Sequence, residues 1–276
     1  MKRHYLIAFT ALLLAASTLP AAASDLNGFM PQAGEATFAL SYTVEGYDEF
    51  YRGDTLVPAP PGLGEVETTS LTAWFRYGIT DDFAVSINAP YVDTEGDGSA
   101  GFEDSGLGDV TLLGYLRLAE WGGAARHSLT GAGGLRLESG YEGDAPVSLG
   151  DASNDMLVRL VYQVEAGNLY FSQQVGYDWR SGEVPDVLPL HTELGYTFGR
   201  TTVNLFYTNY NSDGGTDIGD PGFTFPSNEE DFERAGAKAY FRLGGSFGLT
   251  AAAYTTLDGR NTGDSTGVSV GGVFGF

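Results

Sequence analysis

His191 and Glu193 are the first candidates for a catalytic pair, because they are two positions apart in one segment. In an extended strand, residues i and i+2 share a face, so the pair resembles a general base and the acid that orients it. Acyl-transfer chemistry would also need a nucleophile within reach of the base. The nearest candidate, Ser172, is expected to lie further along the neighbouring strand. We therefore expect no catalysis here, and two ligands are too few for a metal site.

The composition removes other classes of site. The 276 residues include no cysteine, which excludes disulfides, thiolate metal ligands and cysteine nucleophiles. The formal net charge of −22 gives no attraction for nucleic acid. A hydrophobic content of 42% is enough to build a packed structure, so disorder is not expected. We expect neither an enzyme nor a bound cofactor or metal.

A larger set of candidate residues consists of charged side chains, which stand at alternate positions of otherwise apolar segments. One parity of each segment is apolar, and the other carries the charges. They either line an aqueous passage or pair across the interior, and the sequence leaves both readings open. A rough count from the turns places Arg159, Gln174 and Glu193 in one belt. The inward parity also carries Asp109, Glu138, Gln163, Asp178 and His191. The candidates for lining a pore are Arg76, Arg117, Arg136, Arg159, Arg180, Glu193, Arg234, Lys238 and Arg242.

Twelve segments of alternating hydrophobicity must position these charges, and no convincing amphipathic helix is present. Most are about ten to thirteen residues long, which suffices for a tilted strand to cross a bilayer. Ordinary globular strands are shorter, about five to six residues. The predicted strands are 37–45, 71–77, 83–91, 109–118, 127–139, 154–165, 168–180, 187–198, 201–211, 232–243, 247–257 and 265–276.

The connections between these strands alternate between short turns and long, glycine-rich, acidic loops. This pattern is typical of bacterial outer-membrane barrels, and an even number of strands places both termini on the periplasmic side. A soluble β-sandwich, the alternative, needs neither long strands nor a strict alternation of loop lengths. The sequence therefore predicts an all-β, antiparallel transmembrane barrel. The expected long loops are 48–66, 92–108, 140–153, 181–186, 212–231 and 258–264.

The first 23 residues have the pattern of a secretory signal peptide. A basic start is followed by a short apolar run and small residues that end at Ala23. We expect cleavage there, with residues 24–276 forming the barrel. Only eleven residues, 24–34, would then precede the first strand, too few for a plug domain. Any constriction of the lumen is expected from inward-folded loops, with 48–66 and 212–231 the best candidates.

The last predicted strand ends on an aromatic residue. Phe274 and Phe276 share its apolar face, as in the terminal strands that the barrel-assembly machinery recognises. Aromatic residues near other strand ends suggest girdles at the two membrane surfaces. The girdle candidates are Trp74, Tyr77, Tyr91, Trp121, Tyr177, Trp179, Tyr196, Phe198 and Phe247.

The acidic loops have three readings. Carboxylates in 93–108 and 212–231 suit Ca²⁺, but their spacing does not form an EF-hand. They would otherwise bridge divalent cations to lipopolysaccharide phosphates, or simply be solvated. The last reading is favoured.

Three stretches resemble a known bacterial family. GLGDVTLLGYLRL (106–118), PVSLGDASND (146–155) and QVGYDWR (174–180) are similar to outer-membrane proteins named for the meta-pathway of phenol degradation, whose members are called transporters. The resemblance covers most of the chain after residue 23. It implies a barrel of this size and uptake of aromatic or other small compounds. It implies no catalytic or substrate-binding residues.

These observations predict a bacterial outer-membrane barrel for passive or weakly selective passage of small solutes. An interior rich in Arg and Lys would favour anionic solutes, although acidic outer loops would oppose this. The expected partners are outer-membrane lipid and lipopolysaccharide, the assembly machinery and a small-molecule solute. One alternative is a closed structural or surface-interaction barrel that acts through its acidic loops. Another is a lipid-modifying enzyme that depends on His191.

Overall fold

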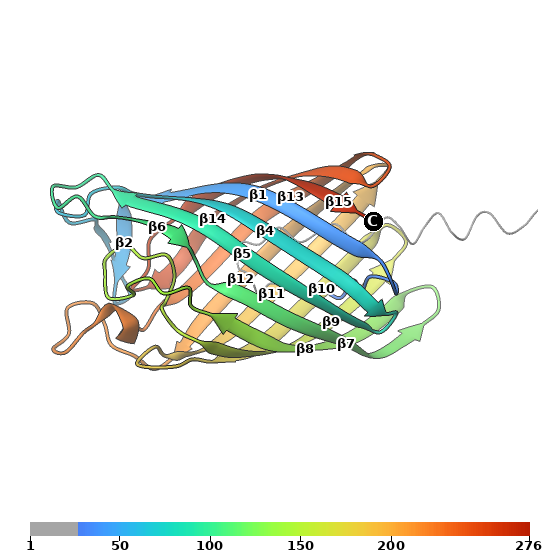
Figure 1. The fold of residues 1–276 in the computed structure, drawn as a ribbon, viewed down its shortest axis with the longest axis horizontal. Coiled ribbons are helices and arrows are strands. Elements are labelled where there is room, and N and C mark those ends of the chain that lie inside the picture. The colour runs from blue at the N-terminus through green and yellow to red at the C-terminus, as the bar shows by residue number, and fades with distance from the viewer. Residues whose placement is uncertain (1–26) are drawn as a thin grey trace, which may run out of the picture.

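Twelve long antiparallel strands form a closed barrel, in which β1 pairs with β4 on one side and with β15 on the other (Figure 1). The computed structural model describes residues 27–276, and the predicted signal peptide, 1–23, lies outside the described residues. All twelve predicted strands are present. They are β1 (Ala36–Tyr47), β4 (Val66–Thr80), β5 (Phe83–Gly96), β7 (Val110–Gly122), β8 (Arg126–Leu137), β9 (Asp155–Ala166), β10 (Leu169–Trp179), β11 (Asp186–Phe198), β12 (Thr201–Asp213), β13 (Asp231–Gly244), β14 (Phe247–Arg260) and β15 (Thr266–Gly275).

Two of the expected loops contain additional short elements. The loop after β1 forms a hairpin of β2 (Glu49–Arg52) and β3 (Thr55–Pro58), which lies apart from the main sheet. The loop after β5 turns back as β6 (Glu103–Leu107) and pairs with the last residues of β5. A single turn of 3-10 helix, η2 (Phe225–Ser227), lies in the loop before β13. No helix among residues 27–276 is long and apolar enough to cross a membrane.

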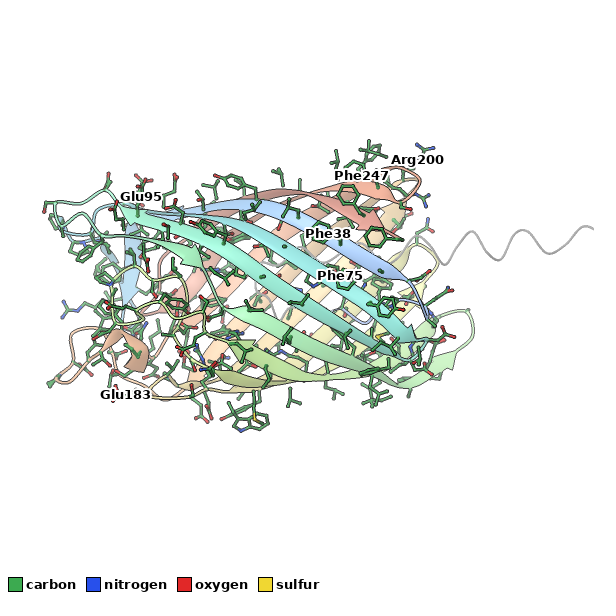
Figure 2. The ribbon with its side chains drawn as sticks, in the orientation of Figure 1. Phe38, Phe75, Glu95, Glu183, Arg200 and Phe247 are labelled. Carbon is green, nitrogen blue, oxygen red and sulfur yellow. The ribbon has the colours of Figure 1, made fainter. Side chains whose placement is uncertain are left out.

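The outside of the barrel is apolar and the inside is polar. Leu205 and Val270 are about 60% exposed on the outer face, whereas Gln163 and Gln174 are fully buried on the inner face. Figure 2 shows Phe38, Phe75 and Phe247 on the outside of the wall. A soluble protein would bury the apolar face, so this inversion means that hydrocarbon surrounds the barrel and that strand pairing satisfies the backbone.

The two ends of the barrel differ. The short turns at 81–82, 123–125, 167–168, 199–200 and 245–246 lie at one end, here called the short-turn end. The chain also terminates there, and Ala36 exchanges two backbone hydrogen bonds of 2.9 Å with Phe276. The long loops lie at the opposite end, here called the long-loop end, where Figure 2 places Glu95 and Glu183. The predicted alternation of turn lengths is confirmed.

Strand register differs from the expected belt by two residues. Arg159 lies opposite Gly176 rather than Gln174, and Gln174 lies opposite His191 rather than Glu193. A shift of two residues keeps every side chain on the same face. The predicted faces were therefore correct, whereas the predicted neighbours across the strands were not. The predicted girdle also contained one error. Trp74 points inward and packs with Ala39 and Val273, because it shares its parity with Arg76.

Candidate functional site in the barrel lumen

The segment before β1 lies inside the lumen at the short-turn end. It is anchored at the rim, where the N–H of Ala33 donates to the Asp81 carboxylate at 2.9 Å. Deeper inside, the N–H of Gly28 donates to the side-chain oxygen of Gln163 at 2.8 Å, and the amide of Asn27 points to Glu193 at 3.5 Å. The expectation that any constriction would come from inward-folded loops was wrong, because residues 27–29 themselves contact the inner wall. An extended segment spans about 3.3 Å per residue, so even a few residues reach well into the lumen.

Apolar contacts and a buried arginine hold this segment. The ring of Phe29 meets Tyr170 edge-on, with centroids 4.8 Å apart. Met30 packs on an inward apolar patch that includes Tyr115 and Leu157. Arg76, predicted as an inward cation, donates to the carbonyl of Phe29 at 3.1 Å. The segment is therefore bound to the wall through several independent contacts.

Three of the predicted arginines form one ionic network toward the long-loop end. Arg136 lies 2.8 Å from Asp155 and 3.5 Å from Asp178. Arg159, which has no exposed side-chain surface, pairs through both terminal nitrogens with Asp178. Arg180 pairs with Asp151, the third carboxylate, and approaches Asp155 at 3.5 Å. Buried charges are tolerated only when paired in this way.

Glu193 is the centre of a second network. It pairs with Lys238 at 2.7 Å and accepts hydrogen bonds from Tyr170 and from Asn204, the latter at 3.3 Å. His191 approaches the same carboxylate at 3.6 Å. Glu193 therefore serves as an acceptor for several donors rather than as the orienting acid of one base.

The geometry at His191 does not assemble a nucleophile and a base. Its Nδ1 is 2.8 Å from the hydroxyl of Thr208. Ser172 lies directly opposite Glu193, closer than the sequence suggested. Its hydroxyl makes no hydrogen bond among residues 27–276, to His191 or to any other group. Within the same residues, no three His, Asp or Glu side chains are grouped as a metal would require.

The remaining predicted cations lie near the two ends. Arg117 sits at the short-turn rim, 3.1 Å from Glu120 and 3.8 Å from Asp82. Arg242 is partly exposed near the same end of β13. Arg234 lies near the long-loop end, 3.2 Å from Glu45 and stacked over the ring of Phe232.

A cavity of about 600 Å³ lies beneath the loops at the long-loop end. The β2–β3 hairpin and the loop that contains η2 both contribute to its wall, as do the loops after β5 and β8. The volume is in the range of small-molecule sites. Its lining combines apolar side chains with five charged ones. The charged ones are Glu45, Asp151, Arg180, Glu230 and Arg234, and the apolar ones include Phe50, Leu63, Phe102, Val147, Val184, Ile218 and Phe225.

Sequence reasoning identified the cations and missed most of their partners. Asp155 and Glu45 have the inward parity of their strands and were detectable from alternation alone. Asp151 and Glu230 lie in loops, where no periodicity signals direction. The N-terminal segment carried no sequence signal for its place in the lumen, because its contacts come from β4, β7, β9, β10 and β11.

Comparisons with known proteins bear on the fold. No family model and no curated protein sequence matches the chain. An outer membrane channel from Pseudomonas putida F1 superposes with a TM-score of 0.73 at 15% identity, covering 91% of this chain and 99% of that one. The NanC porin gives 0.53 at 10% identity, with 85% and 98% coverage. The translocator domain of the autotransporter NalP from Neisseria meningitidis gives 0.51 at 10% identity, with 88% and 89% coverage.

The fold is that of an outer-membrane β-barrel. The closure of the sheet through β1 and β15 agrees with the superposition on these barrels. The barrel belongs in the bacterial outer membrane, because only a lipid environment accommodates so large an apolar outer surface.

Proposed function

We propose that this barrel is a channel for the passage of small solutes across the outer membrane, and that solutes enter through the cavity at the long-loop end. The cavity is the observation that carries the proposal, because its lining combines lumen residues of the strands, such as Thr94 and Arg234, with loop residues such as Phe225. Its apolar wall suits solutes with an aromatic or other apolar part. This agrees with the uptake role implied by the resemblance noted in the sequence.

The proposal does not include a preference for anions. Arg136, Arg159, Arg180, Arg234 and Lys238 each lie within ion-pair distance of a carboxylate. A lumen of balanced charge has no excess positive potential to concentrate anions. We propose that these side chains line the passage as polar, mutually neutralising walls.

The N-terminal segment narrows this passage at the short-turn end. Residues 27–31 lie in the lumen at the short-turn end and 32–34 lie at its rim, so a solute must pass beside them or displace them. Because several weak contacts hold the segment, its displacement costs less than opening the barrel wall, whose strand hydrogen bonds have no alternative partners in lipid.

Single-channel recording in planar bilayers tests the proposal. We expect discrete conductance steps, and partial block when an aromatic solute is added on the long-loop side only. A folded barrel without steps would favour the second candidate, a closed barrel that acts through its acidic loops. The paired lumen charges and the filled short-turn end are the observations that favour that candidate.

A further inference from the structure

One carboxylate in the wall of the cavity has no cationic partner among the described residues. Glu230 lies just before β13 and accepts one side-chain hydrogen bond, from Thr262 at 2.7 Å. By contrast, Glu45 pairs with Arg234 and accepts from Tyr254, and Asp151 pairs with Arg180. The two arginines that line the cavity are therefore already engaged by other acids.

The charge of the cavity wall is consequently unbalanced. Three acids and two cations line it, which leaves one negative charge, and Glu230 is the acid that lacks a partner. Burial in the wall, reinforced by the nearby Asp151 carboxylate, raises the pKa of Glu230, although the Thr262 hydrogen bond and the Arg234 and Arg180 guanidiniums act in the opposite direction. Although burial also opposes ionisation of Asp151, the Arg180 and Arg136 guanidiniums outweigh it and lower the pKa of Asp151. Among the described residues, Glu230 is thus the acid of the cavity wall that makes no ion pair.

The surroundings of Glu230 suit a cation with an apolar body. The rings of Phe50, Phe102 and Phe225 line the same cavity. Aromatic faces attract cations as well as apolar groups. The chain as a whole carries a net charge of −22, which draws cations rather than anions toward the mouth.

We propose that the cavity at the long-loop end is a binding site for small organic ammonium compounds, with Glu230 as the acceptor for the ammonium group and the three phenyl rings as the seat for the apolar part. This inference rests on the proposed function and specifies its solute class. The ligand supplies the positive charge that the cavity wall lacks. Glu230 is partly buried, and a partly desolvated carboxylate without an ion pair gains from a charged donor.

Three probes of the same shape distinguish charge from hydrophobicity. Calorimetric titration of the full-length refolded barrel would compare 2-phenylethylamine, the neutral 2-phenylethanol and the anionic phenylacetate, with empty micelles as the blank. We expect the amine to bind about tenfold more tightly than the alcohol, and the acid most weakly. Glu230→Gln should remove the difference between amine and alcohol while leaving the binding of the alcohol unchanged.

A matched control uses the neighbouring carboxylate. Glu229 approaches Arg260 at 3.4 Å and is absent from the cavity wall, so Glu229→Gln should keep the preference for the amine. If Glu230→Gln fails to fold by its gel mobility before and after heating, Glu230→Asp serves instead and should retain a weaker preference for the amine.

The outcomes separate this inference from the channel proposal. A preference for the alcohol or the acid, or an amine preference that survives Glu230→Gln, would overturn the inference. Failure of all three probes to bind would also overturn it. None of these results affects conductance steps, which decide the channel proposal on their own.

Discussion

The backbone N–H of Gly28 donates a 2.8 Å hydrogen bond to the side chain of Gln163, across 135 positions of sequence. This bond fixes the N-terminal segment against the inner face of β9. Gln163 is fully buried, and its own amide donates to Glu165 at 3.0 Å. The segment and the wall are therefore parts of one hydrogen-bonded structure.

Enlarging residue 28 should open the short-turn end of the lumen. A Cβ atom at Gly28 would lie 2.6 Å from the Cβ of Gln163. The barrel wall is rigid, so the N-terminal segment has to move instead. We expect Gly28→Val to displace the segment and to raise single-channel conductance severalfold, while the barrel remains folded. Gly123→Ala, at a turn where nothing lies within 4 Å, is the control. Equal conductance in all three proteins would refute a constricting role for the segment.

Removing the carboxylate of Asp178 should leave positive charge in the lumen. Arg136 and Arg159 share this carboxylate, and Arg159 has no other acidic partner among the described residues. Asp178→Asn should therefore shift the reversal potential in a salt gradient toward anions. Breaking a buried pair costs about 3–5 kcal/mol, so the unfolding temperature should also fall.

The control for that experiment is Glu67→Gln. Glu67 is an exposed acid of β4, and its removal changes the net charge equally. A selectivity shift of the same size in the control would attribute the effect to overall charge rather than to the ionic network.

The contacts of Asp217 should make the stability of the loop between β12 and β13, which lines part of the cavity, sensitive to acid. Arg260 donates two hydrogen bonds of 2.8 Å to this carboxylate, and Asn261 donates one of 2.7 Å. These bonds lower the pKa of Asp217. A lowered pKa means that the stabilisation is fully present above the ordinary aspartate pKa of about 4 and disappears as the pH falls through the lower, folded value.

Hydrogen exchange of residues 214–230, corrected for the intrinsic pH dependence of exchange, measures this effect. We expect protection to be constant between about pH 5 and pH 7 and to fall in stronger acid. Asp217→Asn should reduce protection throughout, whereas Asp220→Asn, an exposed acid in the same loop, should behave as wild type. Full protection in Asp217→Asn at neutral pH would contradict the assigned role.

Phe276 should matter for assembly and not for stability. Its backbone pairs with Ala36, but its side chain is 70% exposed and adds little packing. We expect Phe276→Ala to lower the amount of folded barrel in the outer membrane of cells, with an unfolding temperature within experimental error of wild type after refolding in vitro. Phe198→Ala, an outward aromatic at the same end, is the comparison. Equal cellular yields for the two variants would count against an assembly signal at the C-terminus.

The strands and their faces were predictable from the sequence because alternation is a local property. Phe274 and Arg159 were assigned to opposite faces by parity alone, and the register error of two residues at Arg159 did not alter those assignments. Loop lengths likewise predicted which ends of the strands lie together. In a lipid-facing barrel, a local period of two residues determines the direction of every strand side chain.

The tertiary structure alone decided what fills the lumen and where its charges go. The position of Gly28 depends on its hydrogen bond to Gln163, and the charge of Arg159 is neutralised by Asp178 on the next strand. The isolation of Glu230 depends on how the six long loops fold over the mouth. Such contacts join residues that are distant along the chain and depend on register and loop conformation, which hydrophobic periodicity does not encode. Local alternation thus predicts a barrel and its two faces, whereas contacts made in the closed structure determine which charges are paired, which one is not, and what occupies the lumen.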